Sequence, residues 1–246
     1  MVRYQLLIEY VGTSFKGWQI QKKGLTIQGI IQEKISKLLK ENIILNGSGR
    51  TDTGVHAIEQ SAHFECNSEI LDLTKFLKSI NHFLNEKGIA ILKIKKRSNK
   101  FHSRFSAKQR IYKYVIFNQI SAPVIEKKRG WHVRKPLDPE LIKKGAKRLV
   151  GTYDYSTFRS SSCHAKSPIR TIKSIKVRSL KNKIELEFKS QSFLQQQVRS
   201  MVGCLKFLGE KKWDLKTFDK AFKSKKRILC APPAPPEGLF LKKIIY

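Results

Sequence analysis

The segment from Gly49 to Ala57, Gly-Arg-Thr-Asp-Thr-Gly-Val-His-Ala, holds residue types that could do chemistry. Its one carboxylate, Asp52, stands two residues after Arg50 and between two glycines. Glycines allow tight turns and let a ligand approach the backbone closely, and a nearby cation favours the ionised form of a carboxylic acid. The segment therefore predicts a nucleophilic carboxylate rather than a general acid. From these residues alone the alternative is an Asx-turn with a surface ion pair, which would contribute less than about 1 kcal/mol.

The elements that must position this segment follow from hydrophobic periodicity. Alternation from Val2 to Tyr10 predicts a strand, and helical spacing after Thr26 predicts a helix to about Lys40. A short strand at Ile43–Leu45 would lead into the glycine-bounded turn. Further strands are expected at 60–66, 89–94, 110–118, 171–178, 183–189 and 239–246, and further helices at 72–84, 138–150, 193–208 and 214–223.

The order β-α-β-β-α-β occurs twice in this series, which is typical of the ferredoxin-like arrangement. We therefore expect an α+β protein of two ferredoxin-like or RRM-like halves, residues 1–104 and 105–246. The two halves would join into one extended, mixed and mainly antiparallel sheet with a central cleft, and clefts of this kind are common ligand sites. Asp72 and Asp138 stand at expected helix N-caps, with Pro139 at the first helical position.

The net charge indicates a polyanionic partner. Fifty Lys and Arg against nineteen Asp and Glu give +31, with a pI near 10.2. Such an excess is typical of nucleic-acid binding, although lysines scattered over a solvated surface would give the same sum.

Several other classes are disfavoured by the composition. No apolar run is long enough to span a bilayer, and the N-terminal residues enter a strand pattern without a signal-peptide core. The four cysteines lie far apart with no CxxC pair, so we expect reduced thiols in a cytoplasmic protein and no metal site. The chain has no glycine-rich nucleotide-binding motif, and we expect no cofactor.

Six spaced motifs resemble the tRNA pseudouridine synthase A family along nearly the whole chain. Besides the Asp52 segment, these are Tyr10–Gln19, Phe101–Ala107 with Arg110–Tyr114, Phe158–Arg170, Phe193–Arg199 and Glu237–Leu241. The chain departs from the family pattern at Ser103, His164, Gln195 and Gln197, where Ala, Gln, His and Met are usual.

The resemblance implies the pseudouridine synthase fold and the isomerisation of uridine at positions 38, 39 and 40 in the anticodon arm of tRNA. Asp52 would be the nucleophile on a flipped-out base, and Arg199 and Arg50 would orient it. Tyr112 would stack on the base and is a candidate for removing the C5 proton, and Leu239 would line the pocket. The resemblance also implies a homodimer and no cofactor.

Basic residues interleaved with aromatic ones suit RNA, because phosphates attract cations and unstacked bases need aromatic faces. The expected RNA contacts, in addition to Tyr112 and Leu239, are Arg104, Phe105, Arg110, Arg159, Ser162, Cys163, His164, Lys166 and Arg170. Trp18 and His63 are instead expected to be packed residues.

Three other functions remain open at this point. A non-catalytic RNA-binding protein of doubled RRM-like fold would explain the charge but not Asp52 in its turn. A metal-dependent nuclease would need more acidic residues near Asp52 than the chain has. A pseudouridine synthase with another RNA target shares the chemistry, and only substrate profiling separates it.

Overall fold

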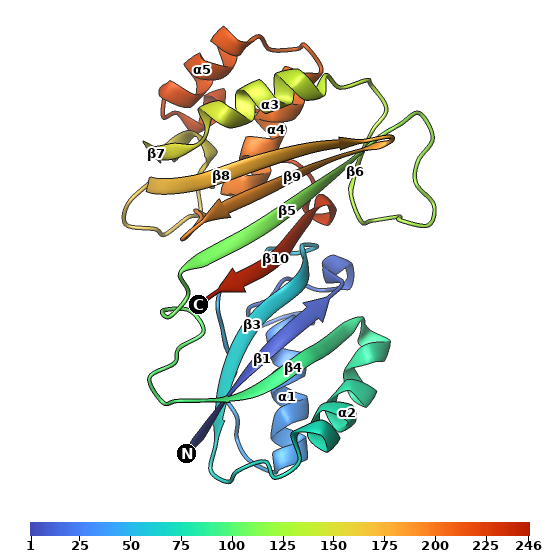
Figure 1. Ribbon diagram of the computed structural model, residues 1–246, viewed down its shortest axis with the longest axis vertical. Helices are drawn as coiled ribbons and strands as arrows, with labels where there is room; N and C mark the ends of the chain where they lie inside the picture. The colour runs from blue at the N-terminus through green and yellow to red at the C-terminus, as the bar shows by residue number, and fades with distance from the viewer. The chain divides into compact units, whose positions relative to one another are not determined.

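The computed structural model describes residues 1–246, and the chain divides into two units (Figure 1). The first comprises Met1–Lys108 together with Phe240–Tyr246, and the second comprises Gln109–Leu239. The first boundary lies close to the predicted division after residue 104. The last strand, predicted to belong to the second half, is part of the first unit.

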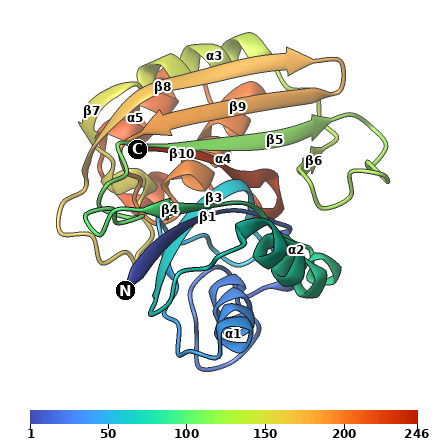
Figure 2. The same ribbon diagram turned by 60° about the horizontal axis from the view of Figure 1, so that its bottom comes forward.

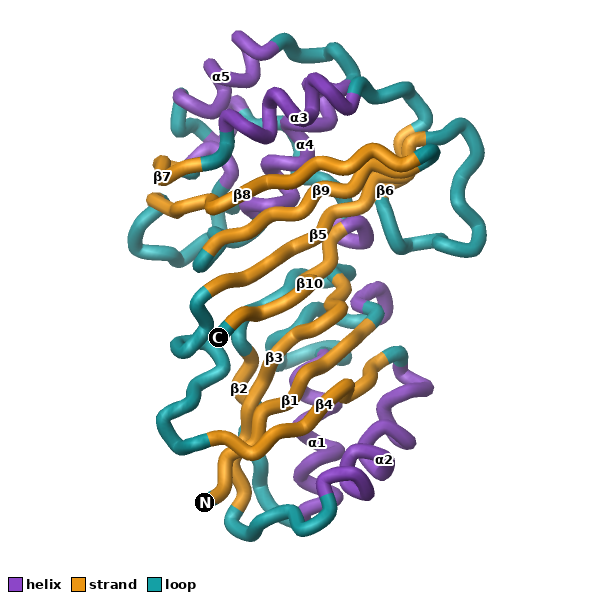
Figure 3. Tube along the Cα trace, in the orientation of Figure 1, coloured by secondary structure: helices purple, strands orange, loops and turns teal.

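The first unit has the predicted ferredoxin-like order. Its elements are β1 (Val2–Tyr10), α1 (Ile27–Leu39), β2 (Asn46–Gly47), β3 (His56–Cys66), α2 (Leu73–Leu84), β4 (Ile89–Arg97) and β10 (Leu239–Ile245). The strands run β4-β1-β3, with β2 antiparallel to β3 and β10 parallel to the start of β3. Helix α2 packs against β4 and against α1 (Figure 3).

Local sequence signals account for these elements. The alternating residues Tyr4, Leu6, Ile8 and Tyr10 of β1 are each 2% exposed or less, because they point into the core. The Thr26 hydroxyl accepts a hydrogen bond from the N–H of Gly29, 3.3 Å away, and so caps α1 as predicted.

The predicted strand at Ile43–Leu45 is wrong, since the short strand β2 lies at Asn46–Gly47. Side chains of α1 take the backbone bonds that a strand would need. The N–H of Ile43 donates to Ser36 Oγ at 3.1 Å, and the N–H of Leu45 donates to Gln32 Oε1 at 3.0 Å. The chain is therefore held on the helix rather than on a neighbouring strand.

The second unit is a sheet with three helices (Figure 2). Its elements are β5 (Gln109–Asn118), β6 (Trp131–Val133), α3 (Pro139–Arg148), β7 (Gly151–Asp154), β8 (Ile169–Leu180), β9 (Lys183–Ser190), α4 (Gln197–Gly209) and α5 (Leu215–Lys223). The order β5-β9-β8-β7 is antiparallel, with β6 parallel to β5. Asp138 caps α3 through the N–H groups of Glu140 and Leu141, as predicted.

Helix α4 begins at Gln197, later than the predicted residue 193. The preceding residue, Gln196, has a left-handed backbone with φ of 60°. The Gln197 side chain then accepts a hydrogen bond from the N–H of Leu194 at 2.7 Å and closes the turn that leads into the helix. No helix in the structure combines the length and apolar character needed to cross a membrane.

Candidate active site

Asp52 lies in the loop between β2 and β3. The loop contains a turn closed by a hydrogen bond from the N–H of Val55 to the carbonyl oxygen of Asp52, at 3.1 Å. Gly54 sits in that turn with φ of +81°, a conformation that favours glycine. The Asp52 side chain is partly buried, while Arg50 and Thr53 on either side are exposed. The loop therefore holds one partly exposed carboxylate in a glycine-containing turn, and this is the local structure that the sequence predicted.

The opening motif, Tyr10–Gln19, forms the wall against which this loop packs. A Cβ on Gly12 would lie 1.9 Å from the carbonyl oxygen of Val55, and a Cβ on Gly17 would lie 2.6 Å from that of Thr51. The N–H of the buried Trp18 donates to the Thr51 carbonyl at 3.1 Å. Only glycine permits these close approaches, so the motif holds both sides of Asp52.

The side chain of Gln60 on β3 holds the backbone at Ser48 and Gly49, where the Asp52 loop begins. Its side chain is fully buried, and its Nε2 donates to the carbonyl oxygen of Gly49 at 3.0 Å. Its Oε1 accepts hydrogen bonds from Ser48 Oγ at 2.6 Å and from the N–H of Ser61 at 3.0 Å. A buried amide satisfied in this way fixes the backbone where the motif begins.

Arg50 is exposed at the start of the motif and donates from Nε to Gln19 Oε1 at 3.2 Å. Gln19 is the last residue of the opening motif, so this contact joins the two motifs side chain to side chain. The predicted role of Arg50 in orienting Asp52 stays a prediction.

The two histidines of β3 are packed residues. His56 is buried, accepts a hydrogen bond at Nδ1 from the N–H of Gly12 at 3.1 Å, and stacks on Phe240 with ring centres 4.7 Å apart. His63 is 3% exposed and accepts at Nδ1 from the N–H of Ser103 at 3.2 Å. Burial, followed by the charges of His102 and Arg3, lowers the pKa of His63 to about 4. The prediction that His63 is a packed residue is confirmed.

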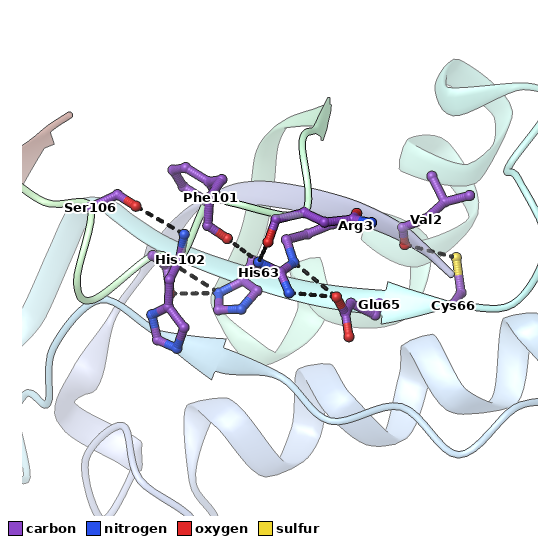
Figure 4. A network of polar contacts seen from close by, with 10 residues as sticks. Val2, Arg3, His63, Glu65, Cys66, Phe101, His102 and Ser106 are labelled. Atoms are coloured by element: carbon purple, nitrogen blue, oxygen red, sulfur yellow. Dashed lines mark hydrogen bonds and ion pairs between the residues drawn. The ribbon is translucent and has the colours of Figure 1, made fainter.

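The Phe101–Ala107 segment is half anchor and half surface. Phe101 is buried against Tyr246, with ring centres 4.9 Å apart, and Ser103 is fully buried (Figure 4 shows Phe101 and its polar neighbours). Phe105 is 76% exposed, and the Arg104 guanidinium lies 5.6 Å from the centre of its ring. Of the predicted RNA contacts, Arg104 and Phe105 are thus at the surface together.

In the second unit, Tyr112 and Tyr114 on β5 differ in exposure. Tyr114 is fully buried, and its hydroxyl donates to the carbonyl oxygen of Pro235 at 2.8 Å. Burial raises the pKa of that hydroxyl well above its ordinary value. Tyr112 is partly exposed and meets the Phe193 ring edge-on, with centres 5.2 Å apart. Tyr112 is therefore the tyrosine of this strand that a ligand could reach.

Arg199 stands in the first turn of α4 and is tied to the Pro-rich link, residues 231–238, that precedes Leu239. Its Nε donates to the carbonyl oxygen of Ala234 at 2.7 Å, and the N–H of Ala234 donates back to the Arg199 carbonyl at 2.9 Å. Leu239 follows the link directly and is 6% exposed. One stretch of chain thus runs from the partner of Arg199 to the predicted pocket residue.

The loop Arg159–Arg170 folds back on itself. Arg159 donates to the carbonyl oxygen of Cys163 at 2.6 Å, and Arg170 donates to that of Ser167 at 2.9 Å. Burial raises the pKa of the Cys163 thiol, but hydrogen bonds from backbone groups of Ala165 and Gln195 and the Arg159 charge outweigh it, so the pKa is lowered. The exposed side chains among the predicted contacts in this loop are Ser162, His164 and Lys166.

Arg110, the remaining predicted contact, lies at the start of β5 and donates to the carbonyl oxygen of Gln191 at 2.6 Å. No group of three or more His, Cys, Asp or Glu side chains is arranged to hold a metal ion, and the four cysteines are free thiols.

An α+β fold, a carboxylate held in a glycine-bounded turn and a net charge of +31 are the features expected of an enzyme that acts on RNA. The sequence model of the tRNA pseudouridine synthase family matches residues 6–106 and 146–246. The chain is 69% identical to the tRNA pseudouridine synthase A of Pelagibacter ubique, with all of both chains covered. It is 38% identical to the enzyme of that name from Parvibaculum lavamentivorans and 39% identical to that of Zymomonas mobilis, again over all of each chain.

The chain therefore belongs to the tRNA pseudouridine synthase family and is an isomerase that converts uridine to pseudouridine in tRNA. This confirms the expected α+β pseudouridine synthase fold and the expected class of reaction. The alternatives of a non-catalytic RNA-binding protein and of a metal-dependent nuclease are wrong.

Proposed function

We propose that the chain isomerises uridines 38, 39 and 40 in the anticodon arm of tRNA, with Asp52 as the nucleophile. The observation that supports this role for Asp52 is the construction of its loop. Gly17 and Trp18 approach the backbone at Thr51, directly before this one carboxylate, and Gly12 approaches it at Val55, three residues after. A surface turn with an ion pair needs no such scaffold, whereas a reacting group must be held in a fixed geometry.

The reaction breaks the bond between uracil N1 and ribose C1′, turns the base, and joins C5 to C1′. A proton leaves C5 and one is gained at N1, so the atoms balance without an oxidant or a cofactor. Covalent attack by the Asp52 carboxylate on the nucleoside divides one difficult step into two easier ones. The uridine must first flip out of the base stack, at a cost of about a few kcal/mol.

In the same proposal Tyr112 stacks on the flipped base and takes part in removing the C5 proton, and Leu239 closes the other side of the pocket. Arg199 and Arg50 orient Asp52. The partial exposure of Tyr112 beside the buried Tyr114 supports its access to a base. The bonds from Arg199 to the link before Leu239 support a common framework for these two residues.

The net charge of +31 supports binding to the phosphates of the anticodon arm. Basic and polar side chains would contact the backbone, and exposed Phe105 would stack on an unpaired base. The proposed RNA contacts are Arg104, Phe105, Arg110, Arg159, Ser162, Cys163, His164, Lys166 and Arg170. We further propose that the enzyme works in the cytoplasm as a homodimer, with each tRNA touching both subunits.

Release of tritium from C5-labelled uridine tests the assignment. Asp52→Asn should remove turnover and leave the affinity for tRNA within a few-fold, since the amide keeps the shape of the side chain. Glu59→Gln, a carboxylate change on β3 beyond the loop, is the matched control and should keep turnover. Substantial turnover by Asp52→Asn would contradict the nucleophile role. Equal release from RNAs with uridine only outside positions 38–40 would contradict the proposed target.

A further inference from the structure

Thr51, the residue directly before Asp52, is held through its carbonyl oxygen and its side-chain hydroxyl. It is buried, and its carbonyl oxygen accepts a hydrogen bond from the N–H of Trp18 at 3.1 Å. Its Oγ1 lies 2.8 Å from the hydroxyl oxygen of Tyr10, and either oxygen can donate. The peptide that joins Thr51 to Asp52 is therefore fixed from two directions.

Tyr10 connects Thr51 to the sheet of the first unit. It is the last residue of β1, 2% exposed, and pairs with Ala57 of β3 on one side and with Ile89 of β4 on the other. The register between β1 and β3 shifts between Ile8 and Tyr10. A bulge of this kind re-aims the side chain that follows it and is frequent beside active sites.

We propose that the Tyr10–Thr51 hydroxyl pair is a positioning device for the Asp52 carboxylate, and this rests on the proposed role of Asp52 as nucleophile. Neither hydroxyl touches the substrate. Their hydrogen bond sets the orientation of the backbone at Thr51 and thereby the direction of the next side chain. Misplacing a reacting group by about 1 Å can reduce the rate by about 100-fold, so the pair acts on turnover rather than on tRNA binding.

Tyr10→Phe tests the pair, because it removes one hydroxyl and keeps the buried ring. The expected result is a kcat lowered by about 10- to 100-fold, with the KM for tRNA within about two-fold of the wild-type value. Thr51→Val should give the same loss, and Thr51→Ser, which restores the hydroxyl, should recover most of the activity. The double variant Tyr10→Phe/Thr51→Val should have a kcat no lower than either single variant, because the two substitutions remove the same hydrogen bond.

Tyr4→Phe is the matched control. Tyr4 lies on the same strand and is equally buried, and its hydroxyl accepts a hydrogen bond from the N–H of Ile70 at 2.9 Å, away from the Asp52 loop. It should lower the melting temperature about as much as Tyr10→Phe does and leave kcat unchanged. A kcat for Tyr10→Phe equal to wild type, or equal losses of kcat in the two variants, would overturn the proposal.

Asp52→Asn separates this proposal from the one on which it rests. Loss of turnover in Asp52→Asn together with normal turnover in Tyr10→Phe would refute only the positioning pair. Turnover retained in Asp52→Asn would refute the nucleophile, whatever the Tyr10 variants do.

Discussion

Acidification should destabilise the first unit through the buried His63. Burial, and then the charges of His102 and Arg3, lowers its pKa to about 4 from the ordinary 6.5, while Glu65 acts in the opposite direction (Figure 4). In the unfolded chain the imidazole titrates near its ordinary value. The unfolded state therefore binds more protons than the folded state between these two pH values. Stability is fully present above pH 6.5 and is lost as the pH falls toward 4.

The size of the effect follows from the interval between 6.5 and 4. At about 1.4 kcal/mol for each pH unit, the complete loss in free energy of unfolding is about 3 kcal/mol. At pH 7 both states are almost wholly neutral at His63, so the cost there is only about 0.2 kcal/mol. At pH 5 the unfolded imidazole is mostly charged, and the cost is about 2 kcal/mol.

Urea unfolding of the wild type and of His63→Asn at pH 7, 6 and 5 measures this term. The Asn amide oxygen can accept the hydrogen bond from Ser103 but does not titrate, so the difference between the two proteins isolates His63 from other groups. Between pH 7 and pH 5 the wild type should lose about 2 kcal/mol more than the variant. His82→Asn, at an exposed position on α2, should keep the wild-type dependence. Equal dependence in wild type and His63→Asn would refute the reasoning.

Two further predictions concern the second unit and the RNA. In Gly203→Ala the new Cβ would lie 2.1 Å from the carbonyl oxygen of Pro232, so the link that binds Arg199 must shift; we expect a loss of about 1–3 kcal/mol in thermal unfolding, as for other overpacked cores. An unchanged melting temperature would contradict that close approach. The logarithm of tRNA affinity should fall with the logarithm of salt concentration by about 0.7–0.9 for each phosphate neutralised, as measured by filter binding. An affinity independent of salt would rule out the electrostatic grip.

Elements with strong local signals could be predicted from the sequence. The alternation in β1 and the caps Thr26, Asp72 and Asp138 are where the sequence placed them, because periodicity and capping depend on neighbours within a few residues. The strand predicted at Ile43–Leu45 does not form, because side chains of α1 accept hydrogen bonds from the backbone N–H groups of Ile43 and Leu45. Those hydrogen bonds join residues that no short window contains.

The site shows the same division. The Asp52 turn could be recognised from its glycines, because Gly54 adopts the positive φ that glycine favours. The packing of the opening motif against this turn could not be predicted from the sequence. Gly12, Gly17 and Tyr10 contact the loop from about forty positions away in the chain. Two glycines before Trp18 were the available signal, and glycines alone do not show which segment of the chain packs against them.

The second unit is an insertion within the first, and this determines when the first can be completed during synthesis. Residues 240–246 leave the ribosome only after all of 109–239. Until then β3 lacks its parallel partner, His56 lacks the Phe240 ring, and Ser61 and Ser103 lack the hydroxyl of Tyr246. Because His56 begins the strand that follows the Asp52 loop, this end of the loop gains its full set of contacts only after residues 240–246 have been made.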